Sequence, residues 1–207
     1  IVSELKSLVD IEKYVHRWRL GKMSPHEFVI LVYCFPTLQA IIQNVHTHTS
    51  LRFEDLDMFV HFDKTIQTTF FYEMLEKYYS LHNIEGNVFR KGIKPELDAL
   101  QEKLDEINTS VQSMVDVLMK NDKSEKKQAT IRFEKTANND SWYFSTTSKR
   151  VESLKKANTL HGYETKTQKS NVRLFHKDID AFRIQYIDTL AQMIECVQKE
   201  FVNQLNS

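Results

Sequence analysis

The chain has 207 residues, with 28 lysines and arginines against 28 aspartates and glutamates, and it contains only four glycines and two cysteines. This length suits one domain or two small ones, and it can bury enough surface to fold without metals or disulfides. The nearest approach to a phosphate-binding loop, from Gly86 to Lys94, has the wrong spacing, so we expect neither an ATPase site nor a bound cofactor in this chain.

The two cysteines and the length of the apolar runs indicate the cellular compartment in which the protein is expected. Cys34 and Cys196 form no Cys-x-x-Cys pair, so we expect neither a disulfide nor a cysteine zinc site. Free thiols are typical of a reducing compartment, which predicts an intracellular protein. We expect no apolar run of the roughly 20 residues that cross a bilayer and no leader, and therefore no membrane partner. The start at Ile1 predicts an excised piece of a longer chain.

Positive charge is concentrated in one quarter of the chain. From Lys120 to Lys169 there are twelve basic and six acidic residues, so this segment carries +6, and the remaining 16 basic and 22 acidic residues carry −6. Charge segregation of this kind points to a polyanion as partner. A basic run alone is more often a solvated face, so composition by itself does not decide the point.

The first part of the chain is predicted to be helical. Apolar residues recur at three- and four-residue steps over Ile1–Trp18, and Gly21 ends this helix. The segment Ser24–Glu27 has the serine, proline and glutamate of a capped helix start, and the helix that follows is expected to kink at Pro36. An aromatic-rich stripe predicts one or two further helices over Leu51–Leu81.

Two long apolar stripes follow. The first runs unbroken over Leu97–Leu118 with the spacing of a coiled-coil seam, and the second runs over Ile179–Phe201. At 1.5 Å per residue, a helix over Pro95–Asn121 would reach about 40 Å. Because each stripe needs a partner, the two helices are predicted to pair antiparallel within the chain, and a zipper between two chains is the alternative.

The segment between these helices has a different period. Residues 129–134 alternate between apolar and polar, and the β-rich stretch Ser141–Ser148 follows, which predicts a hairpin. Arg150–Ala157 has helical spacing, and Tyr163–Leu174 alternates again as one further strand. The predicted fold is mainly α, with a helical core (1–121 and 173–207), two long antiparallel helices, and a small inserted α+β module (122–172) at their tip.

Three segments carry a resemblance to a known family. They are SLVDIEKYVHRWRLGKMSPHEFVIL, EGNVFRKGIKPELDAL and TQKSNVRL. In order and spacing they resemble the lever domain and inserted clamp domain of the MutS family of DNA mismatch-recognition proteins. The third is similar to the family's return motif TLKNxxR at Thr167, Lys169 and Arg173, with Ser170 standing where the family usually has Asn or Asp.

The resemblance implies a function. In this family the clamp grips the backbone of duplex DNA without reading its sequence, and the levers transmit that contact to an ATPase domain, which lies outside this fragment. The fragment would then be no enzyme, whereas its parent protein would bind ATP and magnesium and form a dimer. Non-specific phosphate contacts need lysines and short polar groups. The motif supplies Lys169 and Ser170 as DNA contacts, and local charge adds Lys149, Arg150, Lys155, Lys156 and Lys166.

Other interpretations are weaker. Trp142, Tyr143 and Phe144 could stack on single-stranded bases, but aromatic residues in a strand are more often core. His46 and His48 could face a metal, but no further ligand completes a tetrahedral set. The main alternative function is a coiled-coil scaffold or adaptor whose tip module binds a protein partner.

Overall fold

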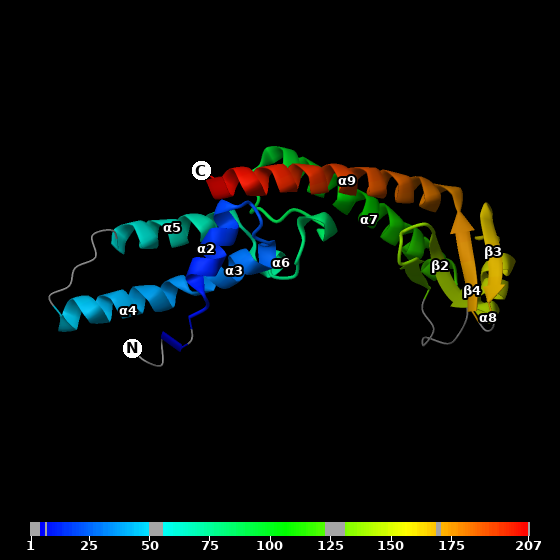
Figure 1. Cartoon of the computed structure of the whole chain (residues 1–207). Coiled ribbons are helices and arrows are strands. Elements are labelled where there is room, and N and C mark those ends of the chain that lie inside the picture. Colours follow the sequence, from blue (N-terminus) through cyan, green and yellow to red (C-terminus); the bar gives the residue numbers. More distant parts are fainter. Residues whose placement is uncertain (1–4, 7, 50–55, 123–130, 169–170, 207) are drawn as a thin grey trace. The chain divides into compact units, whose positions relative to one another are not determined.

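A computed structural model describes residues 5–6, 8–49, 56–122, 131–168 and 171–206 of the chain. The chain divides into two compact units (Figure 1): unit 1 consists of Ile1–Ala99 and Gln192–Ser207, and unit 2 of Leu100–Ala191. The sequence predicts a different division, with residues 122–172 as an inserted domain. The two compact units do not test that division, which stays a prediction.

Unit 1 is built of helices. It wholly contains α2 (Ile11–Arg19), α3 (Pro25–Tyr33), α4 (Phe35–His48), α5 (Leu56–Thr69) and α6 (Tyr72–Leu75). A short 3₁₀ helix, η1 (Leu81–Asn83), follows. The first turn of α7 (Pro95–Asn121) and the last part of α9 (Lys177–Asn206) complete the unit.

The helix starts follow local chemistry. The predicted capping box is confirmed, because Ser24 Oγ accepts from the Glu27 N–H at 3.2 Å and the Glu27 carboxylate accepts from the Ser24 N–H at 2.9 Å. The expected single helix over Ile1–Trp18 is wrong, since α2 begins only after the side chain of Asp10 caps it. The expected kink at Pro36 takes the form of an interruption at the single residue Cys34, whose backbone stays in the helical region (φ −78°, ψ −19°). The proline lies in the first turn of α4, where its missing N–H costs no hydrogen bond.

Glu27 makes the stability of unit 1 depend on pH. Partial burial opposes ionisation, but the Ser24 N–H and the Arg17 guanidinium outweigh it and lower the pKa of Glu27. A group whose folded pKa is depressed contributes stability above its unfolded pKa and loses it as pH falls through the folded pKa. We therefore expect the unfolding free energy of wild type to fall more steeply between about pH 5 and pH 3 than that of Glu27→Gln. Urea denaturation at several pH values measures the unfolding free energy of both proteins. The same dependence of this free energy on pH in wild type and Glu27→Gln would contradict the prediction.

The core of unit 1 is an aromatic cluster to which both ends of the chain contribute. Phe28 packs edge-on against Phe70 and Phe201 with ring centroids 5.5 and 5.7 Å apart, and Phe70 lies 4.8 Å from Phe89. All four rings are essentially fully buried. Residues far apart in the sequence are thereby held in one core.

The stretch Pro25–His48, which comprises α3 and α4, is long and apolar enough to cross a membrane by length and composition alone. The expectation that no apolar run approaches this length is wrong here. Phe28, Val29, Leu31 and Val32 of this stretch are buried in unit 1, and a core helix passes the same test. That the chain has no membrane partner stays a prediction.

Unit 2 contains a four-stranded antiparallel sheet in the order β1-β2-β4-β3. Its elements are β1 (Arg132–Lys135), β2 (Trp142–Thr147), α8 (Ser148–Lys156), β3 (Tyr163–Gln168) and β4 (Asn171–His176). The predicted single strand over Tyr163–Leu174 is wrong, because β3 and β4 are separate strands that pair with each other. Polar alternation continues through both strands, so periodicity alone could not show where the chain reverses.

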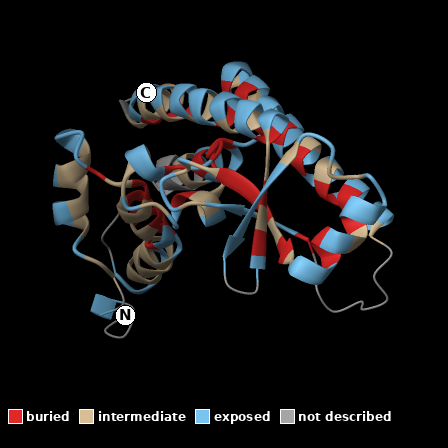
Figure 2. Ribbon diagram, turned by 90° about the vertical axis from the view of Figure 1, so that its right-hand side faces the viewer, coloured by how far each residue is buried: buried red, intermediate tan, exposed pale blue. Residues whose placement is uncertain are grey.

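The sheet has a covered face and an outer face. Trp142, Phe144, Val172 and Leu174 belong to the covered face and are at most 4% exposed. In β4 the residues between them are more exposed, whereas in β2 the outer-face residue Tyr143 is also buried, at 6%. Figure 2 colours the chain by burial. On the covered side, the ring of Trp142 lies 5.2 Å from that of Tyr186 in α9. Val151 and Leu154 of α8 are buried as well, and α8 approaches β2 and β4.

The prediction of two long helices paired as levers, with a small clamp module at their tip, is not borne out. Both long helices form, and the chain is mainly helical, but two residues of the apolar stripe of α9 pack on partners outside α7: Tyr186 on Trp142 of the sheet, and Phe201 on the aromatic cluster of unit 1. The sheet shares its compact unit with residues 100–121 and 177–191 of these helices. Heptad spacing shows that one face of a helix is apolar, but it does not show which surface covers that face.

Candidate nucleic-acid interface

The structure separates the seven predicted DNA contacts into groups. Lys149, Lys155 and Lys156 are exposed on α8, and Lys166 is exposed on β3. Arg150 is buried. Lys169 and Ser170 lie outside the described residues.

At one edge of the sheet, β2 and β3 end and β4 begins. Thr147, the last residue of β2, pairs with Asn171, the first residue of β4, and Asn171 also pairs with Gln168, the last residue of β3. We call the edge formed by Thr147, Gln168 and Asn171 the hairpin edge. The predicted pair Lys169 and Ser170 lies between Gln168 and Asn171 in the sequence.

Helix α8 begins at this same edge, because Thr147 is also its N-cap residue. The Thr147 side chain makes no capping hydrogen bond, so the first N–H groups of α8 receive no partner from it. The N-terminal end of a helix carries a partial positive charge, and Lys149 in the first turn adds a full one. The hairpin edge thus combines positive charge with short polar side chains.

Lys155 and Lys156 lie at the other end of α8, in its last turn. Lys149 and Lys155 are six positions apart, which corresponds to about 9 Å along the helix axis. The lysines of α8 are therefore spread along the helix instead of gathered at the hairpin edge.

Two cations are held over aromatic rings on the outer face of the sheet. The Arg173 guanidinium carbon lies 4.5 Å from the ring centre of Tyr143, and Lys166 Nζ lies 5.0 Å from that of Phe175. The two rings are 5.6 Å apart, and Lys166 is the register partner of Arg173. Cation–π contacts of this kind fix the position of a charge without neutralising it.

Arg150 has a structural partner. Its Nη1 lies 2.6 Å from Oδ2 of Asp122, and the two side chains are 10% and 3% exposed. Asp122 directly follows α7, so this ion pair ties the end of α7 to α8. A phosphate would have to displace a buried carboxylate to reach Arg150, and this residue is therefore not part of the proposed contact surface.

The weaker interpretations of the sequence find little support. Trp142, Tyr143 and Phe144 are at most 6% exposed, so their rings are not available for stacking on bases. Within the described ranges, no group of three His, Cys, Asp or Glu side chains could hold a metal ion. Cys34 and Cys196 are free thiols, of which Cys34 is buried and Cys196 is partly exposed, although both were expected to be buried.

The chain can be compared with known proteins. No protein-family model matches it. Over 117 residues, or 55% of the chain, it is 26% identical to a protein of Acanthamoeba polyphaga mimivirus described as a DNA mismatch repair protein mutS homolog. The matched region spans about a tenth of that relative's length. This similarity indicates a MutS-like relationship.

Proposed function

We propose that the chain is part of a MutS-like DNA mismatch repair protein, in which unit 2 grips the backbone of duplex DNA without reading its sequence. The observation that carries this proposal is the convergence at the hairpin edge. There the first turn of α8, with Lys149, lies at the same end of the sheet as the last residue of β3 and the first residue of β4. The motif residues Lys169 and Ser170 stand between these two strands in the sequence. The similarity to a mutS homolog supports the same conclusion.

The chemistry of the hairpin edge suits phosphate oxygens. Lysines, short polar side chains and helix N-termini are the groups that position a protein on DNA without specifying a sequence. Lys149 supplies charge, and Thr147, Gln168 and Asn171 supply hydroxyl and amide groups. Lys166 precedes Gln168 by two residues on the same strand and so points to the same face of the sheet.

The remaining functional proposals concern the parent protein. By its resemblance to the MutS family, the parent is an intracellular dimer whose ATPase domain binds ATP and magnesium. The chain itself catalyses nothing and transmits DNA contact to that domain. Its partner is double-stranded DNA.

Substitution at the hairpin edge tests the proposal. We expect Lys149→Gln/Lys166→Gln to weaken duplex binding and to reduce the slope of log affinity against log salt by about 0.9 for each phosphate that the variant no longer neutralises. Fluorescence anisotropy of a labelled duplex across a salt series measures both effects. Lys103→Gln, an exposed position of α7 in the same unit, is the matched control and should leave the slope unchanged.

A second variant locates the contact. Lys155→Gln/Lys156→Gln removes the same charge from the other end of α8, and it should reduce the slope less than the first pair. An equal reduction by both pairs would mean that general charge, and not the hairpin edge, attracts the DNA. A slope that neither pair alters would contradict the proposed contact surface.

A further inference from the structure

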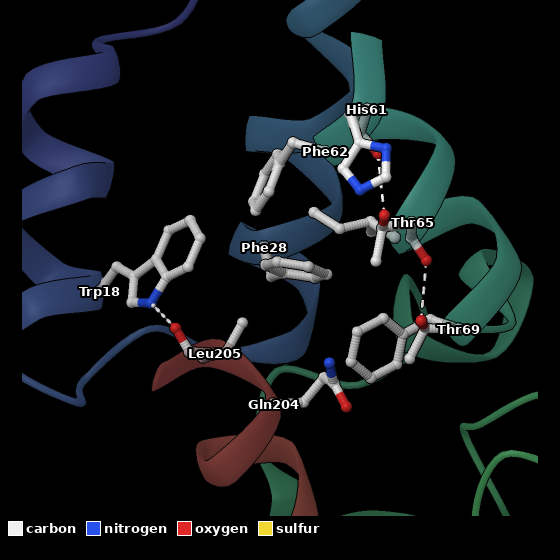
Figure 3. A pocket seen from close by; sticks show the side chains of 10 residues that line it. Trp18, Phe28, His61, Phe62, Thr65, Thr69, Gln204 and Leu205 are labelled. Atoms are coloured by element: carbon white, nitrogen blue, oxygen red, sulfur yellow. Dashed lines mark hydrogen bonds between the residues drawn. The ribbon is translucent and has the colours of Figure 1, made fainter. Parts of the chain in front are cut away.

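Unit 1 contains a half-enclosed pocket of about 420 Å³ that the proposed DNA contact does not use. Its walls come from α2, α3, α5 and the end of α9 (Figure 3). Four aromatic residues line it: Trp18, Phe28, Phe62 and Phe70. A volume of this size lies within the range of about 300–1,000 Å³ that is typical of small-molecule sites.

The aromatic walls are held in place by specific contacts. Trp18 Nε1 donates to the carbonyl oxygen of Leu205 at 2.9 Å, which fixes the indole against the end of α9. Trp18 and Phe62 are stacked at 5.9 Å, whereas Phe28 meets Trp18 edge-on at 6.2 Å. Fixed ring faces and edges of this kind offer both offset-stacked and edge-to-face contacts to a further ring.

Four of the side chains that line the pocket are polar, namely His61, Thr65, Thr69 and Gln204, and the two threonines of α5 have hydroxyls of known bonding. Thr65 is exposed, and its Oγ1 donates to the carbonyl oxygen of His61 at 2.8 Å. Thr69 is 7% exposed, and its Oγ1 donates to the carbonyl oxygen of Thr65 at 2.7 Å. A hydroxyl has one proton, so each threonine meets a ligand as a hydrogen-bond acceptor.

We propose that this pocket binds a small, uncharged planar aromatic molecule that carries one hydrogen-bond donor, of the phenol or indole class. The rings of unit 1 enclose the planar part, and a threonine hydroxyl accepts from its O–H or N–H group. A charged ligand is disfavoured, because no Lys, Arg, Asp or Glu is among the described residues that line the pocket. Transfer of an unpaired charge against aromatic walls would be costly.

Fluorine NMR with 4-fluorophenol as the probe tests the proposal on the whole chain. We expect saturable line broadening of the probe at millimolar concentrations. 4-Fluoroanisole has the same ring but no donor, and it should bind about two- to tenfold more weakly, as expected for the loss of one hydrogen bond. No saturable broadening by 4-fluorophenol would overturn the proposal.

Variants on α5 assign the probe to the pocket. Thr65→Leu fills the rim and should abolish binding, whereas Thr68→Leu, an exposed position of the same helix that does not line the pocket, should leave it unchanged. Thr69→Val keeps the side-chain shape and removes the hydroxyl, so the preference for the phenol over the anisole should shrink. Circular dichroism establishes that each variant is folded. Binding that survives Thr65→Leu, or that is lost equally in a folded Thr68→Leu, would show that the probe binds elsewhere.

Discussion

Replacing Arg150 by alanine should lower the unfolding free energy of unit 2 by about 3–5 kcal/mol, because it removes the cation that faces the buried carboxylate of Asp122. The two side chains are 10% and 3% exposed and lie 2.6 Å apart, so little solvent can take the place of the guanidinium. Urea denaturation measures the change. The chain has two tryptophans, so Trp18→Phe leaves Trp142 as a fluorescent reporter that belongs to unit 2.

Two further variants isolate the ion pair. Lys149→Ala removes a neighbouring but exposed cation and should change the unfolding free energy by no more than about 0.5 kcal/mol. Asp122→Leu combined with Arg150→Met replaces the pair by apolar groups and should recover most of the stability that Arg150→Ala removes. A decrease of less than about 1 kcal/mol in Arg150→Ala would mean that the pair contributes little and that Arg150 could serve DNA contact after all.

Phe201→Ala is expected to lower the unfolding free energy of unit 1 by about 3–5 kcal/mol. Phe201 is 1% exposed, and its ring lies 5.7 Å from both Phe28 and Phe70, so its removal opens a cavity between two aromatic side chains. Denaturation followed through Trp18 in a Trp142→Phe background measures the change. The result tests whether the end of α9 is part of the aromatic core of unit 1.

Val202→Ala is the matched control, since this neighbouring side chain on the same helix is 43% exposed. We expect a change of about 0.5 kcal/mol or less. Equal effects of the two substitutions would contradict the burial of Phe201 in the cluster.

Local signals predicted local structure well. The capping box at Ser24 and the two long helices follow from side chains within a few residues of one another. What those helices pack against depends on residues far away in the sequence. Phe201 meets Phe28, and Tyr186 meets Trp142, and no periodicity carries that information.

The sequence identified the proposed DNA-contact residues only in part. Charge alone pointed to Lys149 and Lys166, which lie near the hairpin edge, but equally to Lys155 and Lys156 at the far end of α8. The sequence does contain an indication that Arg150 is buried. Arg150 precedes Leu154 by four residues, so helical spacing places it on the apolar face of α8. Its partner Asp122 lies 28 positions earlier, and only the fold brings the two together.

We propose that this chain grips duplex DNA through backbone phosphates. The most direct test is the affinity of the chain for two duplexes of unrelated sequence, measured by anisotropy from about 50 to 200 mM salt, with Lys169→Glu alongside wild type. We predict equal affinities for the two duplexes, a log–log slope of about −2 to −4 for two to four phosphate contacts, and a shallower slope in Lys169→Glu. Absence of binding at low salt, or an affinity that salt does not change, would contradict the account and favour a scaffold that binds protein partners.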